Sequence, residues 1–224
     1  MKTISLESID STNTYLKKIK NPTEDVLVFA KRQTGGRGTK GRSFICEEGG
    51  IYLSLLKLYP CDAKDSFSIM MNSALAVVKT LRAFDVKAKI KWPNDIIVNG
   101  KKICGILIEN VFEGEHVARS IVGIGLNVNN PLADEIKDIA ISIKEVLNKE
   151  ICLQTVLATL VYNLYLPSSY EEYKKHLLYL GEEVTLTVGG EEKRVIMNGV
   201  LENGNLQTSD GEVFSSAEIT LRKA

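Results

Sequence analysis

The chain has 224 residues, and its 28 Lys and Arg balance 28 Asp and Glu, so the formal net charge is zero. This balance argues against a protein whose main work is to coat nucleic acid, because that work requires a basic excess, and it leaves open a basic patch within a neutral chain. The length allows one domain, or one large and one small domain, and the hydrophobic fraction of 44% suffices for a core.

The sequence carries no recognisable targeting or spanning segment. Residues 1–13 lack the basic region and the apolar run of a signal peptide, and no stretch approaches the ~20 apolar residues of a membrane-crossing helix. The four cysteines lie far apart without a CxxC pair, so they predict reduced thiols rather than a disulfide framework or a zinc cluster. We therefore expect a cytoplasmic protein that is not attached to a membrane.

The first part of the chain is predicted to contain three strands and two helices. Alternating apolar and polar residues over 3–8 indicate a strand, and the capping residues at 10–13 begin a short helix. Apolar runs predict strands at 26–30 and 51–58. Residues 66–84 carry apolar side chains at helical spacing, which is typical of a helix with one face on a core.

A meander of strands is predicted to follow. Strands are expected at 87–92, 95–98, 102–111 and 116–126, with hairpin turns at Asn99-Gly100 and Glu113-Gly114. Two or three helices fill residues 142–179, interrupted near Pro167. Because the strands are joined by hairpins rather than by βαβ repeats, we predict an α+β fold in which helices flank a mixed β-sheet.

The texture of the sequence changes after residue 180. Short strands are expected at 184–188, 192–197, 205–208, 212–214 and 218–222, separated by glycine-containing turns. This pattern predicts a small antiparallel β-barrel of about 40 residues, too small to be very stable unless it docks on the main domain. The predicted domains are therefore residues 1–180 and residues 181–224.

A loop rich in glycine and cationic side chains is the first candidate site. Residues 35–42 include four glycines together with Arg37, Lys40 and Arg42. Glycine lets backbone N–H groups approach an anion, and arginine binds phosphate oxygens bidentately. A solvated surface loop has the same composition, so both interpretations stay open. Residues 36–43 match the glycine spacing of a P-loop, but Arg42 stands where that motif requires lysine.

Residues 91–95, with the sequence Lys-Trp-Pro-Asn-Asp, form the second candidate site. The proline favours an extended residue before a turn, and the turn places Asn94 and Asp95 beside Lys91. The alternative is structural: Trp92, the sole tryptophan, belongs to the core, and the Asn-Asp pair hydrogen-bonds its own backbone.

Two further segments carry chemically informative residues. Lys102 opens an otherwise apolar strand in which Gly105 permits close backbone approach, although a solvated strand end would look the same. Residues 123–129, with the sequence Gly-Ile-Gly-Leu-Asn-Val-Asn, end a strand and place two asparagines in a loop. The glycine spacing there does not match a dinucleotide-binding fingerprint.

Taken together, the order and spacing of these segments closely resemble the biotin protein ligases. The most specific part is Lys-Trp-Pro-Asn-Asp, followed by a lysine and Cys-Gly-Ile-Leu-Ile-Glu. The resemblance is strong over residues 4–130, whereas the last segment matches the family only in length and texture. The matching segments are 11–13, 33–42, 91–95, 101–109 and 123–129.

The resemblance implies a reaction in two steps. The carboxylate of biotin attacks the α-phosphate of ATP, giving biotinyl-5′-adenylate and pyrophosphate, with Mg²⁺ on the phosphates. A lysine amine of a biotin carboxyl carrier protein then attacks the mixed anhydride and releases AMP. Cationic groups and N–H donors suit this chemistry, because they offset the repulsion between a carboxylate and a triphosphate.

The resemblance also implies roles for individual residues. Lys102 and Arg37 would act as catalytic cations, and Asp95 would hold the metal indirectly or order its loop. The residues expected to contact biotin are Ser11, Thr12, Asn13, Gln33, Arg37, Gly38, Thr39, Lys102, Gly105 and Ile106. Those expected to contact ATP or the adenylate are Arg37, Lys40, Arg42, Phe44, Lys91, Asn94 and Asn127.

Three departures from common family patterns bear on these roles. Many relatives have arginine at the position of Thr39 and tryptophan at the position of Phe44, so this chain has one cation fewer and a smaller ring for stacking. Some relatives carry an N-terminal helix-turn-helix domain. Here the Ser-Thr-Asn motif begins at Ser11, which leaves no room for that domain, and we expect no DNA binding.

Two alternatives remain open. A lipoate or octanoate ligase shares the catalytic fold, but its signature includes an arginine pair before a glycine cluster and lacks Lys-Trp-Pro-Asn-Asp. A non-catalytic biotin-binding regulator would not need Lys102 and Arg37. The resemblance is compatible with a homodimer formed through an edge strand, and also with a monomer.

Overall fold

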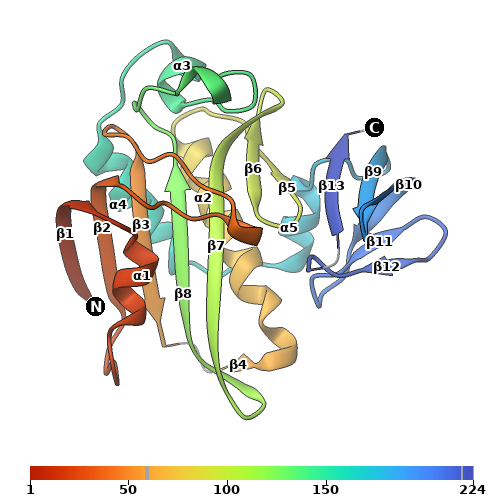
Figure 1. The fold of residues 1–224 in the computed structure, drawn as a ribbon, viewed down its shortest axis with the longest axis horizontal. Coiled ribbons are helices and arrows are strands. Elements are labelled where there is room, and N and C mark those ends of the chain that lie inside the picture. The colour runs from red at the N-terminus through yellow and green to blue at the C-terminus, as the bar shows by residue number, and fades with distance from the viewer. Residues whose placement is uncertain (59–60, 218, 224) are drawn as a thin grey trace.

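The computed structural model describes residues 1–58, 61–217 and 219–223, which form two β-sheets with helices on both faces of the larger one (Figure 1). Among the described residues, neighbouring strands of the larger sheet are antiparallel, except that the strands Lys2–Ile9 and Val26–Gln33 are parallel. The larger sheet contains, in spatial order, β1 (Lys2–Ile9), β2 (Val26–Gln33), β3 (Ile51–Lys57), β8 (His116–Leu126), β7 (Lys101–Glu113), β6 (Asp95–Val98) and β5 (Lys89–Lys91), and β4 (Cys61–Asp62) pairs with β8.

The long hairpin of β7 and β8 forms the middle of this sheet. Its register places Gly105 opposite Gly125 and Leu107 opposite Gly123. Side chains alternate between the two faces of a strand, so these four residues share one face. On that face three of these four positions on β7 and β8 are therefore glycines without a side chain, beside Leu107.

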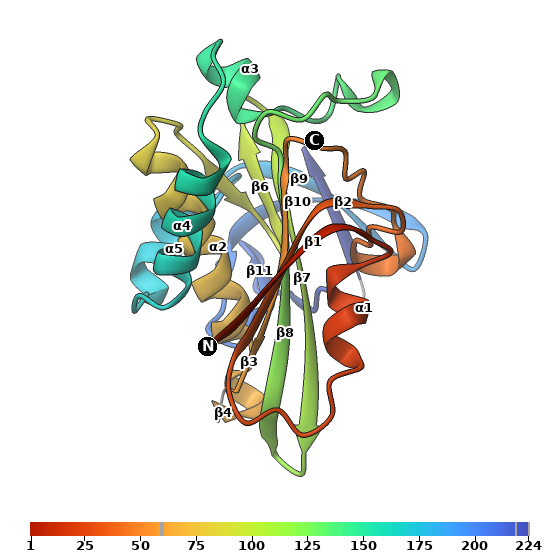
Figure 2. The ribbon, with the colours of Figure 1, turned by 90° about the vertical axis from the view of Figure 1, so that its left-hand side faces the viewer.

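Helices cover the two faces of the larger sheet unequally (Figure 2). The helices α2 (Phe67–Ala83), α4 (Leu153–Leu164) and α5 (Tyr170–His176) lie on one face, over the main hydrophobic core. The short α1 (Thr12–Lys17) lies on the other face, above a smaller apolar cluster that includes Leu16 and Ile121. No helix within the described residues is both long and apolar enough to cross a membrane.

Smaller elements complete the main part of the fold. The N-terminus of α3 (Ile143–Leu147) has a capping box. The side chain of Ser142 accepts a hydrogen bond from the backbone N–H of Glu145, and the side chain of Glu145 accepts one from the backbone N–H of Ser142. Single turns of 3-10 helix occur at Thr39–Gly41, Ala63–Asp65 and Asp134–Ile136.

The predicted C-terminal β-barrel is wrong in one respect: the strands are present, but the sheet is open. Its order is β12 (Val213–Phe214), β11 (Leu206–Thr208), β10 (Glu191–Val200), β9 (Glu183–Val188) and β13 (Ile219–Lys223). Within the described residues the two outer strands, β12 and β13, do not pair. The strand β12 has only two residues, so its free edge is too short to close a barrel against β13. Glu218, the first residue of the last predicted strand, lies outside the described residues.

The smaller sheet packs directly on the main part of the molecule. The indole Nε1 of Trp92 donates a hydrogen bond to the carbonyl of Gly204 at 2.9 Å, and Phe67 packs against the same glycine. The hydroxyl of Tyr170 donates to the carbonyl of Val200. One hydrophobic cluster runs through both sheets. A domain boundary at residue 180 stays a prediction.

Candidate active site

A cavity of about 350 Å³ lies on the face of the larger sheet that carries α1, and the smaller sheet closes one side of it. The loop after β2 crosses in front of β8 and β7 (Figure 1), and residues of this loop between 37 and 44 line the cavity. All but one of the residues predicted for the site line this cavity: Ser11, Thr12, Asn13, Gln33, Arg37, Gly38, Thr39, Lys40, Arg42, Phe44, Lys91, Asn94, Asp95, Lys102, Gly105 and Ile106.

One end of the cavity is lined by uncharged side chains that form a hydrogen-bond network. The backbone N–H and the hydroxyl of Thr12 both donate to Oε1 of Gln33, at 2.7 and 3.0 Å. The Nε2 group of Gln33 donates to Sγ of Cys46 at 3.0 Å. Burial raises the pKa of the Cys46 thiol to about 11, so this sulfur is a neutral thiol at physiological pH. Ser11 caps the first turn of α1 beside this network.

A second branch of the network runs through Asn13. Its Oδ1 accepts a hydrogen bond from the hydroxyl of Ser54, and its Nδ2 donates to Oε2 of Glu109 at 2.9 Å. Lys17 pairs with the other carboxylate oxygen of Glu109 at 2.6 Å. Each polar group at this end of the cavity is thus held by another protein group before any ligand arrives.

Strand glycines form the floor of the cavity. A Cβ atom at Gly123 would overlap the side-chain oxygen of Asn13, and one at Gly125 would lie 2.6 Å from the ring of Phe44. A Cβ atom at Gly105 would lie 3.0 Å from Nζ of Lys102. The asparagine, the ring and the lysine therefore pack directly against the strand backbone, where any side chain larger than that of glycine would displace them.

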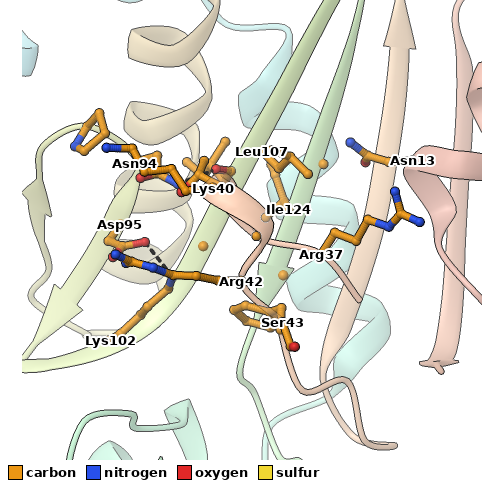
Figure 3. A pocket seen from close by; sticks show the side chains of 18 of the residues that line it. Asn13, Arg37, Lys40, Arg42, Ser43, Asn94, Asp95, Lys102, Leu107 and Ile124 are labelled. Atoms are coloured by element: carbon orange, nitrogen blue, oxygen red, sulfur yellow. Dashed lines mark hydrogen bonds and ion pairs between the residues drawn. The ribbon is translucent and has the colours of Figure 1, made fainter. Parts of the chain in front are cut away.

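The other end of the cavity is cationic. Nζ of Lys102 lies 2.5 Å from Oδ1 of Asp95 and 5.6 Å from the centre of the Phe44 ring. Burial lowers the pKa of Lys91, and the positive charges of Lys102 and Arg42 lower it further, whereas Asp95 acts in the opposite direction. Figure 3 shows Arg42 beside the Lys102–Asp95 pair, and Asn13 on the far side of the cavity. This arrangement concentrates positive charge around one carboxylate.

The glycine-rich loop is folded by its own backbone. The N–H of Gly38 donates to the carbonyl of Arg42 at 2.7 Å, and the N–H of Phe44 donates to the carbonyl of Gly36 at 3.0 Å. Gly36 is required because a Cβ atom there would overlap the carbonyl oxygen of Phe44. Lys40, whose φ of 56° is left-handed, donates from Nζ to the carbonyl of Ile219 at 2.7 Å. Within the described residues, the guanidinium groups of Arg37 and Arg42 have no ion-pair partner.

Two asparagines predicted to contact the nucleotide are already engaged with the protein. Asn94 lines the cavity, but its Nδ2 donates to the carbonyl of Ile106 at 2.8 Å, which ties the turn to β7. Asn127 is the predicted site residue that does not line the cavity. It is buried, and its amide bonds to the carbonyl of Ile141 and to Asn130. A nucleotide contact of Asn127 stays a prediction.

One wall of the cavity was missed at the level of sequence. The segment that enters β13 closes the side of the cavity next to the cations, and Lys40 is bonded to it. Its composition is that of any exposed turn and strand, so no local signal could have assigned it to a site. The residues of this wall are Ser216, Ala217, Ile219, Thr220 and Leu221.

Comparison with known protein families gives a match over more than half of the chain. Residues 5–127 match the biotin/lipoate A/B protein ligase family. The bifunctional ligase/repressor BirA of Bacillus subtilis is 34% identical over 203 residues, which cover 87% of this chain and 62% of that protein. The biotin--[acetyl-CoA-carboxylase] ligase of Paracoccus denitrificans is 33% identical over 127 residues, covering 55% of this chain and 53% of that protein. The chain therefore spans less than two thirds of the length of these relatives.

Solved structures show the same fold. The biotin protein ligase of Aquifex aeolicus in complex with biotin and ATP has a TM-score of 0.82 and 29% identity, covering 100% of this chain and 99% of that one. The Leishmania major biotin protein ligase in complex with biotinyl-5-AMP has a TM-score of 0.66 at 23% identity, covering 98% of each chain, and supports the fold alone. The predicted mixed sheet with flanking helices is confirmed.

Proposed function

This chain belongs to the biotin/lipoate A/B protein ligase family, and on that premise we propose that it is an ATP-dependent biotin protein ligase. It forms biotinyl-5′-adenylate and pyrophosphate from biotin and ATP, and then transfers the biotinyl group to a lysine of a biotin carboxyl carrier protein. Relatives named as biotin ligases, and a similar structure holding biotin and ATP, support this choice of substrates.

The observation that carries the proposal is the contrast between the two ends of the cavity. Biotin has a polar, uncharged ureido ring at one end and a carboxylate at the other, joined by an apolar chain. The neutral hydrogen-bond network around Thr12 and Gln33 suits the ring, and apolar lining side chains such as Leu107 and Ile124 suit the chain. The cations around Lys102 suit a carboxylate that meets a triphosphate.

In the proposed reaction Lys102 works at the reacting centre. Its ammonium group is paired with Asp95 at 2.5 Å and lines the cavity, at the point where the substrate carboxylate and the α-phosphate would meet. It would donate to both groups and stabilise the negative charge that develops as the carboxylate attacks. Arg37, which has no ion-pair partner among the described residues, would act as the second cation.

The remaining lining residues are assigned to binding. Phe44 rests on Gly105 and Gly125 and offers a ring face on which adenine could stack. The loop residues Gly38 and Thr39 would lie along the substrate tail and the adenylate. Binding contacts at the biotin end are assigned to Ser11, Thr12, Asn13, Gln33, Gly105 and Ile106, and those at the nucleotide end to Lys40, Arg42, Lys91 and Asn94.

Mg²⁺ is the metal that ATP chemistry implies. Among the described residues no three His, Cys, Asp or Glu side chains come together, so a metal held by protein groups alone does not fit. A metal held by phosphate oxygens and water fits better, because that is the usual mode of Mg²⁺ in nucleotide sites. Asp95 is the one carboxylate among the described lining residues and is the group that could add to such a shell. The ion would neutralise charge on the phosphates.

The remaining expectations about partners and location stay predictions. We propose that the chain acts in the cytoplasm, without binding DNA, on a carrier protein that presents its target lysine to the cavity. A homodimer would be detected by size-exclusion chromatography with light scattering. DNA binding would be detected as a gel shift that depends on biotin and ATP.

The decisive experiment is ATP–pyrophosphate exchange, measured separately with biotin and with lipoate. A biotin ligase exchanges label with biotin and not with lipoate, and a lipoate ligase shows the reverse. A non-catalytic regulator binds biotin in a calorimetric titration but shows no exchange with either acid. Exchange that depends on biotin, followed by labelling of a carrier protein, is the expected result.

A further inference from the structure

Asn13 is held on every side at the neutral end of the cavity. Its side chain lies on Gly123, where any Cβ atom would overlap its oxygen. The buried hydroxyl of Ser54 donates to its Oδ1, and its Nδ2 donates to Glu109 at 2.9 Å. Only about 6% of Asn13 is exposed, and that part faces the cavity. Such a side chain presents its amide to a ligand in one fixed orientation.

Glu109 decides which way round that amide lies. An ionised carboxylate accepts hydrogen bonds and cannot donate them, so the nitrogen of Asn13, and not its oxygen, must face Glu109. Ser54 is also within hydrogen-bond distance of the hydroxyl of Thr12, and so could orient its own proton either way. Of the two neighbours, the carboxylate is therefore the one that removes the ambiguity.

Lys17 fixes the carboxylate in turn. Its Nζ lies 2.6 Å from Oε1 of Glu109, which leaves Oε2 for Asn13. The three residues come from the two ends of α1 and from β7, and Glu109 lies on the same face of β7 as Gly105 and Leu107, which line the cavity. The ion pair is about half exposed, so its own contribution to folding is small.

We infer that Glu109, held by Lys17, is a positioning residue that orients the amide of Asn13 toward the polar ring of the substrate and so sets affinity for that ring. The inference rests on the proposed function, because the ring is that of biotin. Glu109 does not line the cavity, so it acts through Asn13 and not by contact.

The test is a double-mutant cycle of Glu109→Gln and Asn13→Ala in biotin-dependent ATP–pyrophosphate exchange. Glutamine keeps the size of the side chain but can donate as well as accept, so the amide of Asn13 loses its fixed orientation. We expect the KM for biotin to rise about tenfold, the scale of one charge-assisted hydrogen bond, with kcat and the KM for ATP within about twofold of wild type. In the Asn13→Ala background the same change should have no further effect.

Two further variants calibrate the result. Lys17→Met leaves the carboxylate in place and should raise the KM for biotin by a smaller factor, about threefold, because exposed ion pairs couple weakly. Glu7 lies on the edge strand β1 and forms another exposed ion pair, with Lys31. Glu7→Gln removes this pair and should leave the KM for biotin unchanged. If Glu109→Gln does not fold, the KM for biotin of Lys17→Met decides the question: a rise supports the positioning role, and an unchanged value overturns it.

The outcomes separate this inference from the proposed function. Whether wild-type protein exchanges with biotin at all decides the proposed function before any variant is compared. Calorimetric affinities for biotin give the same cycle without turnover. An unchanged biotin KM in Glu109→Gln, or an equal rise with and without Asn13, would overturn the positioning role. A fall in kcat together with a rise in both KM values would also overturn it, as a sign of general damage.

Discussion

The two ends of the cavity are built in different ways. At the neutral end, the side chains of Thr12, Gln33 and Asn13 are each hydrogen-bonded to other protein groups. At the cationic end, backbone hydrogen bonds hold the glycine-rich loop, and positive charges gather around Asp95. The first end is complete without a ligand, whereas the second lacks the negative charge that would balance it.

This difference indicates how each end contributes to the reaction. A network whose hydrogen bonds are already made recognises a neutral ring by shape and by donor–acceptor pattern, with little reorganisation. A cluster of like charges is unfavourable on its own and gains most when an anion arrives. Substitutions at the neutral end should therefore affect biotin binding, and those at the cationic end should affect ATP binding and the chemical step.

The largest effect is expected for Lys102→Ala. This change removes the ammonium group paired with Asp95 and leaves the apolar strand around it intact. Biotin-dependent ATP–pyrophosphate exchange should fall by roughly 10²-fold or more, the cost of losing one transition-state donor. Thermal unfolding provides the control. Exchange close to wild type in a folded Lys102→Ala protein would remove Lys102 from the reacting centre.

At the neutral end, the corresponding change is Gly123→Ala. The added methyl group would displace the side chain of Asn13. We expect the KM for biotin to rise about 30-fold, below the roughly 10²-fold that a displacement of 1 Å can cost, with the KM for ATP unchanged. Gly199→Ala is the matched control, because it also lies in a strand but has only one atom, at 4.0 Å, near its Cβ position. Equal biotin KM values in both variants would contradict the steric argument.

Much of this architecture could be predicted from the sequence, because local patterns determine it. The alternation over residues 3–8 and the turns at Asn99-Gly100 and Glu113-Gly114 gave strands and hairpins that the structure confirms. Barrel closure could not be predicted in this way, since it depends on whether the outer strands β12 and β13 meet, which no local pattern determines. The two-residue strand β4 gave no periodic signal and was missed.

The same limit applies to the site. Motif resemblance brought together residues as distant in sequence as Ser11 and Lys102, and the cavity contains both. It did not find the wall formed by residues 216, 217 and 219–221, whose place depends on how the smaller sheet docks. Glu109 belongs to the recognised motif, but its link to Lys17 spans 92 positions in the chain, and only the folded protein reveals it.

A third test concerns pH at the cationic end. Burial and neighbouring cations lower the pKa of Lys91, so in the window between that value and its ordinary pKa the unfolded chain binds more protons than the folded one. Stability therefore rises with pH in this window, while ATP binding weakens as Lys91 loses its charge. In Lys91→Met the KM for ATP should be about tenfold higher and should no longer change with pH at this step. A wild-type alkaline profile that persists in Lys91→Met would assign the titration to another group.

The smallest effect is expected at Thr39, where the cationic end lacks a charge. Thr39 lines the cavity, and its neighbour Lys40 is engaged with the carbonyl of Ile219 at 2.7 Å. Lys40 is therefore not free to replace the missing cation while that contact is made. An arginine at position 39 would add one charge-assisted hydrogen bond to the adenylate phosphate, on the order of 1.5–3 kcal/mol before desolvation losses.

Desolvation of the new guanidinium offsets part of this gain, so we expect the net gain to fall below the lower end of the range. Thr39→Arg should slow the release of biotinyl-adenylate by roughly tenfold for each 1.4 kcal/mol retained, as measured by stopped-flow. Labelling of bystander lysines, which depends on released intermediate, should fall in proportion. Lys40→Ala is the comparison variant. Because the ammonium group of Lys40 is bonded to the carbonyl of Ile219, its loss should change the rate of adenylate release less than Thr39→Arg does. Equal release rates in wild type and Thr39→Arg would mean that charge on this loop does not retain the intermediate, and that the neutral end and the floor hold it alone.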